Sequence, residues 1–354
     1  MMYKLLNLNN SHLWKNYLNK LPVNQQDVYY TPEYYSIYEK NGDGKAQCFL
    51  FEQNGEIALY PFLINSVNEL GYELDNNYFD IQGAYGYNGV ISTTNEAWFI
   101  NEFYNSFNLY CRENNIIAEF TRFHPVLNNH RFSEQNLNVV FDRKTVFLDI
   151  TKNYNEIWTK EYSGNNRNMI RKAEKSGVKS LISQNEEDYL KFFELYHETM
   201  QNVGATVYYF FSEKYFKNMR MGLKDNLYLI FSKINDEFVG GMILFIYGDY
   251  AHYHLSARKK EFGKYAINNH FLDYAIKVAK KQGCKLFHFG GGTNSNENNP
   301  LFKFKSNFSS QRGEFYFGKK IHNIEIYNQV VNQWAKQNPE KIEQFKNQLL
   351  KYRN

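Results

Sequence analysis

The segment from Phe287 to Phe308 holds the residue types with the clearest potential for chemistry. Three glycines, Gly290–Gly292, follow an apolar run, and a backbone without Cβ atoms can approach a ligand closely. Lys305 then stands between Phe304 and Phe308, so we expect its ammonium group to lie against an apolar wall. A cation held there could stabilise the oxyanion that forms when an amine attacks an ester or a thioester. The alternative is a glycine-rich loop with a lysine whose ammonium group reaches solvent.

Polar and apolar residues alternate along Ala251–Ser256, which predicts a strand. The alternation assigns His252, His254 and Ser256 to one face, opposite Tyr253. A polar face of this kind is typical of a lined cleft or of a wet surface. We therefore consider His254 as a group that could accept a proton from an attacking amine. A purely structural histidine is the alternative.

Four basic residues follow Ser163 at helical spacing: Arg167, Arg171, Lys172 and Lys175. Offsets of four, five and eight place them roughly on one helix face. Such a stripe could bind a diphosphate or the backbone of an RNA. The alternative is a solvated face on which Glu174 is the local partner.

Covalent and metal-based chemistry have little support in the sequence. No Cys or Ser stands in the context of a nucleophile elbow, so a direct attack without an acyl-enzyme is favoured. The three cysteines, Cys48, Cys111 and Cys284, are far apart and lack metal-ligand spacing. We expect no metal, no disulfide framework and no permanently bound cofactor.

The elements that must position these residues recur in the two halves of the chain. The second half predicts three strands, a helix and a further strand: Tyr228–Ser232, Phe238–Ile246, Ala251–Ser256, about 264–282 and Lys285–Phe289. The first half predicts a looser copy: Cys48–Glu52, Ile57–Ile64, Tyr78–Gln82, about 96–112 and Ile116–Phe123. A repeat of this length indicates two domains of one fold. We place them at residues 1–150 and 151–317, with a helical tail, 318–354, that joins the first domain.

Composition limits the class of protein. A chain of 354 residues with a net charge of +4 suits two domains and falls short of a dedicated DNA-binding protein. No window has the roughly 20 apolar residues of a membrane span, and the first residues lack the apolar core of a signal peptide. These features predict a cytoplasmic protein. The composition does not indicate which oligomeric state the protein has.

With these motifs together, the chain resembles the Fem-type branch of the GNAT acyltransferase superfamily. This branch builds peptidoglycan interpeptide bridges and has relatives in surface-polysaccharide gene clusters. The matching motifs of the second half are Asn166–Val178, Tyr253–Ala257, Gly290–Gly292 and Leu301–Phe308. Those of the first half are Tyr30–Tyr35, Tyr85–Gly89 and Arg122–Pro125.

The resemblance implies an α/β (α+β) fold with two tandem GNAT-like domains, each a mostly antiparallel mixed sheet flanked by helices. It also implies transfer of an aminoacyl group from aminoacyl-tRNA, or of an acyl group from a thioester, to an amine. By position, Lys305 matches the lysine that polarises the acyl carbonyl in the family. The expected proton acceptor is His254, His124 or the phosphate-bearing substrate itself. Several bridge-forming members have an acidic residue where this chain has His124. The residues expected to bind substrate are Arg167, Arg171, Lys172, Arg122, Tyr253, Asn269, Gly290, Gly291 and Phe304.

Two departures from the family pattern keep alternatives open. The turn that would cradle the pyrophosphate of acyl-CoA, Lys260–Ala266, retains only Gly263 of its glycines. The coiled-coil arm of staphylococcal-type members, which is associated with tRNA handling, is absent between Gly177 and Tyr228. The expected acceptor is an amine of a muropeptide or of an amino sugar in a surface-polysaccharide precursor. The alternatives are an acyl-CoA-dependent N-acetyltransferase of a nucleotide-linked amino sugar, and a non-catalytic binding member of a polysaccharide assembly complex.

Overall fold

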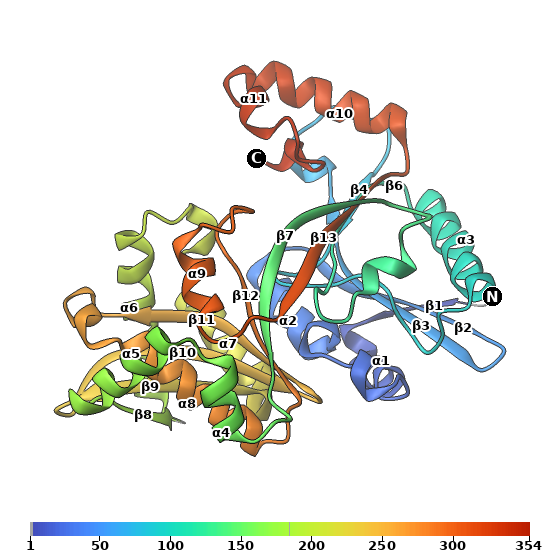
Figure 1. Ribbon diagram of the computed structural model, residues 1–354. Coiled ribbons are helices and arrows are strands. Elements are labelled where there is room, and N and C mark those ends of the chain that lie inside the picture. Colours follow the sequence, from blue (N-terminus) through green and yellow to red (C-terminus); the bar gives the residue numbers. More distant parts are fainter. Residues whose placement is uncertain (1–2, 184) are drawn as a thin grey trace. The chain divides into compact units, whose positions relative to one another are not determined.

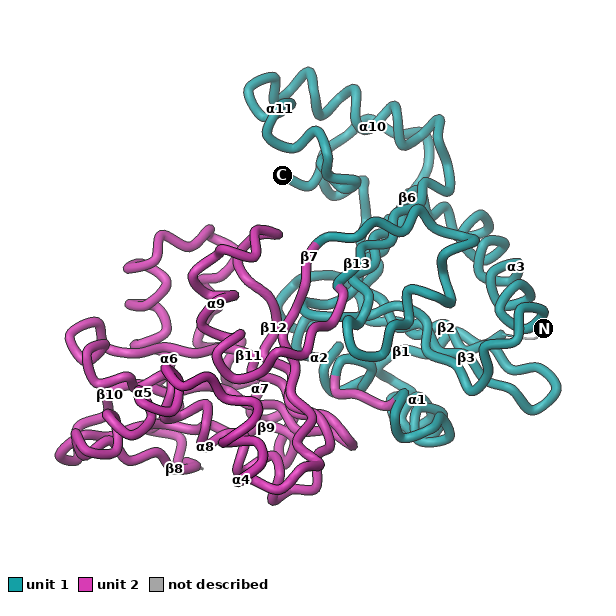
Figure 2. Tube along the Cα trace, in the orientation of Figure 1, with its two compact units in different colours: residues 1–25, 29–142, 315–354 teal, residues 26–28, 143–314 magenta. Residues whose placement is uncertain are grey.

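The computed structural model describes residues 3–183 and 185–354, which form two compact units (Figure 2). Unit 1 comprises residues 3–25, Tyr29–Asp142 and Phe315–Asn354. Unit 2 comprises Gln26–Val28 and Arg143–Glu314. The division differs from the predicted boundary at residue 150, because strand β7 (Asn138–Asp149) begins in unit 1 and its second part pairs with a strand of unit 2. The tail lies in unit 1.

Unit 1 contains a mixed sheet in the order β1-β2-β3-β4-β6-β13, in which β4 and β6 are parallel and the other neighbours are antiparallel. A short strand, β5, pairs with β3. The strands are β1 (Tyr3–Asn7), β2 (Lys45–Gln53), β3 (Glu56–Ser66), β4 (Phe79–Gln82), β5 (Ile91–Ser92), β6 (Ile116–Arg122) and β13 (Arg312–Ile321). The helices are α1 (Ser11–Leu18), α2 (Pro32–Asn41), α3 (Ala97–Glu113), α10 (Ile324–Gln337) and α11 (Ile342–Phe345) (Figure 1).

The core of unit 1 is aromatic. Phe99, Phe103 and Phe107 recur at four-residue steps on α3 and are fully buried, as expected of a helix with one apolar face. They pack against Phe49 and Tyr60 of the sheet. The strands and helix predicted for the first half are therefore present, each within a few residues of its predicted bounds.

The tail is fixed to unit 1 by a buried ion pair. Asp80 of β4 is fully buried, and its carboxylate accepts hydrogen bonds from Arg353 Nε at 2.8 Å and from the Tyr352 hydroxyl at 2.9 Å. A single 3-10 turn, Pro339–Lys341, separates α10 from α11 in the tail.

In unit 2 the order of the sheet strands is β7-β12-β11-β10-β9-β8. Only β11 and β12 are parallel. The strands are β8 (Lys179–Ser183), β9 (Leu227–Ile234), β10 (Glu237–Tyr247), β11 (Tyr250–Arg258) and β12 (Leu286–Gly291). The helices are α4 (Tyr154–Glu156), α5 (Gly164–Lys175), α6 (Glu186–Asn202), α7 (Glu213–Leu223), α8 (Ile267–Lys281) and α9 (Pro300–Ser306), with a π-helical turn at Ile157–Glu161.

Helices cover both faces of this sheet, as two consecutive glycines of β10 show. A Cβ atom on Gly240 would lie 3.0 Å from the Ile267 side chain of α8. A Cβ atom on Gly241 would lie 3.4 Å from Phe192 of α6. Consecutive strand residues face opposite sides, so α8 and α6 lie on opposite faces. The predicted α/β fold, with mostly antiparallel mixed strands flanked by helices in each unit, is confirmed.

Candidate active site

Lys305 lies on α9 beside the glycine-rich end of β12. Its Nζ donates a hydrogen bond to the Gly291 carbonyl oxygen at 2.8 Å and lies 5.3 Å from the centre of the Tyr253 ring. Helix α9 begins at Asn299, whose side chain accepts hydrogen bonds from the first amides of the helix. Gly290 has φ +78°, and a Cβ atom there would lie 3.3 Å from Lys305 Nζ. The glycines thus let the strand end turn closely around the lysine.

The environment of Lys305 disfavours its positive charge. The side chain is only 7% exposed, and burial lowers the pKa of Lys305 from 10.5 to about 7. Throughout residues 3–183 and 185–354, no carboxylate forms an ion pair with it. An ammonium group with one carbonyl partner in a poorly solvated site is a strong attractor for a developing negative charge.

Strand β11 has a β-bulge that changes the predicted faces. Ile243 of β10 pairs with Leu255 of β11, and the next residue of β10 pairs with Tyr253, so His254 is the extra residue. A bulge shifts the side-chain alternation by one. As a result Tyr253 and Ser256 share a face, and their hydroxyl groups form a hydrogen bond. The prediction that His254 and Ser256 lie together opposite Tyr253 is wrong for this reason.

Beyond the bulge, β11 and β12 are no longer paired. Their parallel register extends only over three positions, from Tyr250↔Leu286 to His252↔His288. Past that point Gly290 and Gly291 remain paired with β7, which lies along the opposite edge of β12 from Leu286 to Gly291. The backbone of Tyr253–Ser256 therefore makes no ladder with the glycine segment, and both segments keep polar groups that a bound acyl donor could engage.

The two histidines of β11 have different surroundings. His254 stacks on Phe245 at 4.2 Å between ring centres. Burial, and secondly the charge of His252, lower the pKa of His254 to about 3. The ring is therefore neutral at pH 7 and only weakly basic. His252 is fully buried, and its Nε2 lies 2.7 Å from Asp27 Oδ2, a residue that belongs to unit 2 although it is distant in sequence.

The basic residues of α5 lie in two different environments. Arg167 Nη1 donates hydrogen bonds to the carbonyl oxygens of Trp158, at 3.2 Å, and of Tyr162. These bonds close the end of the π-helical turn, so Arg167 is tied to the protein itself. Arg171 stacks over the Trp158 ring at 5.4 Å, and both Arg171 and Lys172 are exposed. Those two side chains are accessible to an anionic ligand.

Asn166 joins this helix to the turn that precedes α8. Its Oδ1 accepts a hydrogen bond from Asn269 Nδ2 of α8 at 2.8 Å, and the side chain is fully buried. Among the described residues, none accepts a hydrogen bond from Asn166 Nδ2. The preceding turn ends at Ala266, which has φ +54°, a left-handed conformation that is unfavourable for alanine. This turn leads directly into the N-terminus of α8, where backbone amides favour an anion.

Phe304 and the two candidates of the first half complete the predicted set. Phe304 packs against the core of unit 2 and contacts Phe308 at 5.7 Å between ring centres. His124 and Arg122 lie in unit 1. His124 is fully buried, and its Nδ1 accepts hydrogen bonds from the amides of the two residues that follow Pro125, each at 3.2 Å. Arg122 stacks over Phe120 at 5.1 Å.

The sequence indicated Lys305 and the glycine segment as candidate site residues. It did not indicate several buried contacts that the structure contains. The Asp27–His252 pair joins residues 225 positions apart, and no local pattern connects them. The buried Asp273 carboxylate, which accepts hydrogen bonds from the Tyr154 and Tyr162 hydroxyls, was also unpredicted. Its position on the apolar face of α8 is the one signal that could have identified it.

Comparisons with known proteins agree with this geometry. The family model of the acetyltransferase (GNAT) domain matches residues 161–305, which include the glycine segment and Lys305. No curated protein matches the sequence. Residues 161–305, most of unit 2, thus match a GNAT acetyltransferase domain. The fold of the chain is that of the Fem-type branch, as the solved structures show.

The crystal structure of FemX has 16% sequence identity and a TM-score of 0.69, and the match covers 93% of this chain and 99% of FemX. L-PGS from Bacillus licheniformis has 14% identity and a TM-score of 0.56, over 87% of this chain and 91% of that one. A protein of unknown function from Bacteroides thetaiotaomicron VPI-5482 has 9% identity and a TM-score of 0.56, over 90% and 99%. The predicted Fem-type resemblance is therefore confirmed at the level of fold.

No helix in the described part of the chain is long and apolar enough to cross a membrane.

Proposed function

We propose that the protein transfers an acyl or aminoacyl group to an amine of a cell-envelope precursor, and that Lys305 stabilises the tetrahedral oxyanion. The observation that carries the proposal is the buried, unpaired Lys305 ammonium group at the glycine end of β12. The Fem-type fold and the GNAT domain match support transfer to an amine. The acceptor is an amine of a muropeptide or of an amino sugar.

The reaction is a direct attack. The nitrogen lone pair of the acceptor forms a bond to the acyl carbonyl carbon, and the carbonyl π electrons move to oxygen. The oxyanion lies against Lys305 Nζ, which keeps its hydrogen bond to Gly291. Collapse of the intermediate breaks the bond to the donor thiolate or the tRNA ribose oxygen, which finally carries the proton lost by the amine.

The proton reaches the leaving group through His124, His254 or a phosphate of the substrate. His254 is neutral at pH 7, and its pKa of about 3 leaves it with a small driving force for accepting a proton. We therefore expect a modest contribution from His254. Replacement of His254 by Phe should preserve most of the turnover, whereas a loss comparable to that of a Lys305 variant would assign the proton transfer to His254.

The proposal is tested by product formation with defined donor and acceptor pairs. Purified protein is incubated with acetyl-CoA and a UDP-linked amino sugar, or with aminoacyl-tRNA and a UDP-linked muropeptide, and the product mass is measured. Lys305→Ala should lower kcat about 10²- to 10³-fold, the usual loss when one oxyanion partner is removed. Lys303→Ala is the matched control, since Lys303 is exposed on the same helix. Full turnover of Lys305→Ala would refute the role.

A second candidate is an acyl-CoA-dependent N-acetyltransferase of a nucleotide-linked amino sugar. It is favoured by the turn before α8, where the Arg258 guanidinium lies beside Gly263 and no side chain of the described residues caps the α8 N-terminus, whose amides favour an anion. Thermal stabilisation by CoA that is lost in Gly263→Val would support this donor. Absence of any shift with CoA would favour aminoacyl-tRNA, with Lys172 as the next residue to replace.

A further inference from the structure

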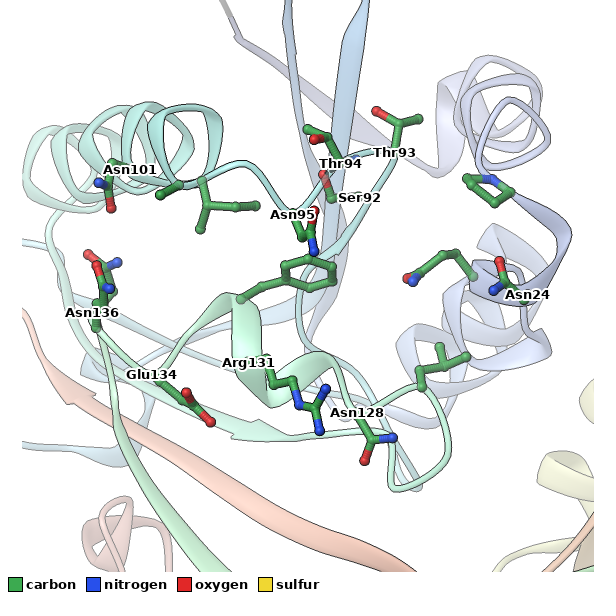
Figure 3. A pocket seen from close by; sticks show the side chains of 17 residues that line it. Asn24, Ser92, Thr93, Thr94, Asn95, Asn101, Asn128, Arg131, Glu134 and Asn136 are labelled. Atoms are coloured by element: carbon green, nitrogen blue, oxygen red, sulfur yellow. Dashed lines mark hydrogen bonds between the residues drawn. The ribbon is translucent and has the colours of Figure 1, made fainter.

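A polar pocket in unit 1 is lined by none of the residues proposed above for acyl transfer. Its volume is about 680 Å³, within the range of roughly 300–1,000 Å³ usual for small-molecule sites. Four segments form its wall: the chain around the 3-10 turn Val23–Gln25, the end of β5 with the stretch that follows it, the first turns of α3, and residues 127–136, which contain the 3-10 turn Asn129–Phe132. Figure 3 shows the labelled side chains arranged around this hollow.

Uncharged hydrogen-bonding groups dominate the pocket. Among its 17 lining residues, seven carry a carboxamide and three carry a hydroxyl. The carboxamides are Asn24, Gln25, Asn95, Asn101, Asn128, Gln135 and Asn136. The hydroxyls are Ser92, Thr93 and Thr94. Each carboxamide offers both donors and an acceptor, which is what a ligand with adjacent hydroxyl groups requires.

Most of these amides are not engaged by the protein. Within the described ranges, the side chains of Asn95, Asn101 and Asn136 make no hydrogen bond to another residue. Gln25 Oε1 is buried and likewise accepts none. The structural asparagine nearby behaves differently, since Asn129 Nδ2 donates to Tyr30 and to two backbone carbonyls. The side chains of Asn95, Asn101 and Asn136 are thus available for a ligand.

The charge of the lining indicates a neutral ligand. Arg131 is its one cation and Glu134 its one anion, so the formal charges cancel. A nucleotide or a polyphosphate would need more basic groups than one exposed arginine. Phe132, Ile100 and Leu127 add apolar surface to the wall, against which the C–H face of a sugar ring can pack.

We infer that this pocket binds a neutral saccharide, held by the Asn and Gln side chains through its hydroxyl or acetamido groups. The inference goes beyond the proposed transfer reaction and does not depend on it. It assigns to unit 1 a recognition function of its own, for a glycan that the protein would bind whether or not unit 2 is acylating an amine.

The test uses the full chain and two neutral probes, N-acetylglucosamine and glucose, with saturation-transfer NMR and titration calorimetry. We expect a saturable dissociation constant on the order of 1 mM for one of them, as is typical of a small ligand held by few contacts. Asn101→Ala and Asn136→Ala should each weaken binding about fivefold, the effect of losing one net hydrogen bond. The double variant should bind about 25-fold more weakly if the two sites are independent.

Two controls keep the outcome distinct from misfolding and from the transfer reaction. Asn105→Ala alters an exposed amide on α3 that does not line the pocket, and should bind like the wild type. Lys305→Ala should also retain saccharide binding, even where it abolishes transfer. Absence of saturation with both sugars, an equal loss in Asn105→Ala, or binding of a neutral peptide in place of a sugar would overturn the inference.

Discussion

Replacing Lys305 by methionine should stabilise unit 2 at neutral and acidic pH. Methionine keeps the length and the apolar character of the lysine stem but carries no charge. Burial lowers the pKa of Lys305 from 10.5 to about 7. At 1.36 kcal/mol for each pH unit, this displacement corresponds to about 5 kcal/mol by which the folded state disfavours the ammonium group. Loss of the hydrogen bond to Gly291 offsets about 1 kcal/mol of the gain.

The advantage of the variant should depend on pH with a defined sign. Below pH 7 both folded and unfolded chains carry the proton, so the cost of burying the charge is present in full. Between pH 7 and pH 10.5 the folded lysine is neutral while the unfolded one still binds a proton, and wild-type stability rises with pH. From about pH 6 to about pH 9.5, the advantage of Lys305→Met should therefore shrink by about 3 kcal/mol.

The assay is urea unfolding of both proteins at each pH, followed by circular dichroism. Peptide-resolved labelling of Cys284, which is buried in unit 2, identifies the transition of that unit. Lys303→Met is the matched control and should show no such trend, because Lys303 is exposed. A stability difference between Lys305→Met and wild type that is negative, or flat across this pH range, would refute the assignment of Lys305 as a buried unpaired cation.

Three further substitutions test the surrounding structure. Gly290→Ala should lower the unfolding free energy by about 1–2 kcal/mol, because φ is +78° there; urea unfolding measures it, and an unchanged midpoint would contradict the strained turn. Arg353→Ala should lower the unfolding free energy of unit 1 by about 3 kcal/mol or more, since it leaves the buried Asp80 carboxylate without its cation. A tail that stays as resistant to limited proteolysis as in the wild type would contradict this prediction. Arg167→Ala should lower the melting temperature, because the guanidinium bonds backbone carbonyls. Exposed Lys172→Ala should leave the melting temperature unchanged.

The repeated order of strands and helix could be predicted because local patterns determine it. Alternating apolar residues specify strands, and the four-residue aromatic steps of α3 specify one buried helix face. The glycine segment was predictable for the same reason, since Gly290 and Gly291 form the end of strand β12. The placement of Lys305 beside them needed only the short connection to α9, which spans fewer than ten residues.

Non-local pairing explains what could not be predicted. The bulge at His254 depends on how β11 pairs with β10. The alternation of polar and apolar residues in either strand alone does not indicate the extra residue. The Asp27–His252 contact depends on the fold of unit 2 as a whole. Arg167 has the sequence context of a phosphate-binding residue, yet the preceding π-helical turn exposes carbonyl groups that take up its guanidinium.

The buried charges of the chain differ in whether an oppositely charged group lies beside them. Asp80 is paired with Arg353, Asp273 with Lys277, and the Glu119 carboxylate with His322. A buried charge that only maintains a fold needs such a partner, because removing one costs several kcal/mol. Lys305 is buried to a similar degree, and its partner in the described structure is a carbonyl oxygen and not a carboxylate. Burial of the Lys305 ammonium group lowers the stability of the folded state by about 5 kcal/mol. A site that leaves a cation unpaired in the free protein is completed when a substrate supplies the negative charge, and in acyl transfer that charge is largest in the tetrahedral intermediate.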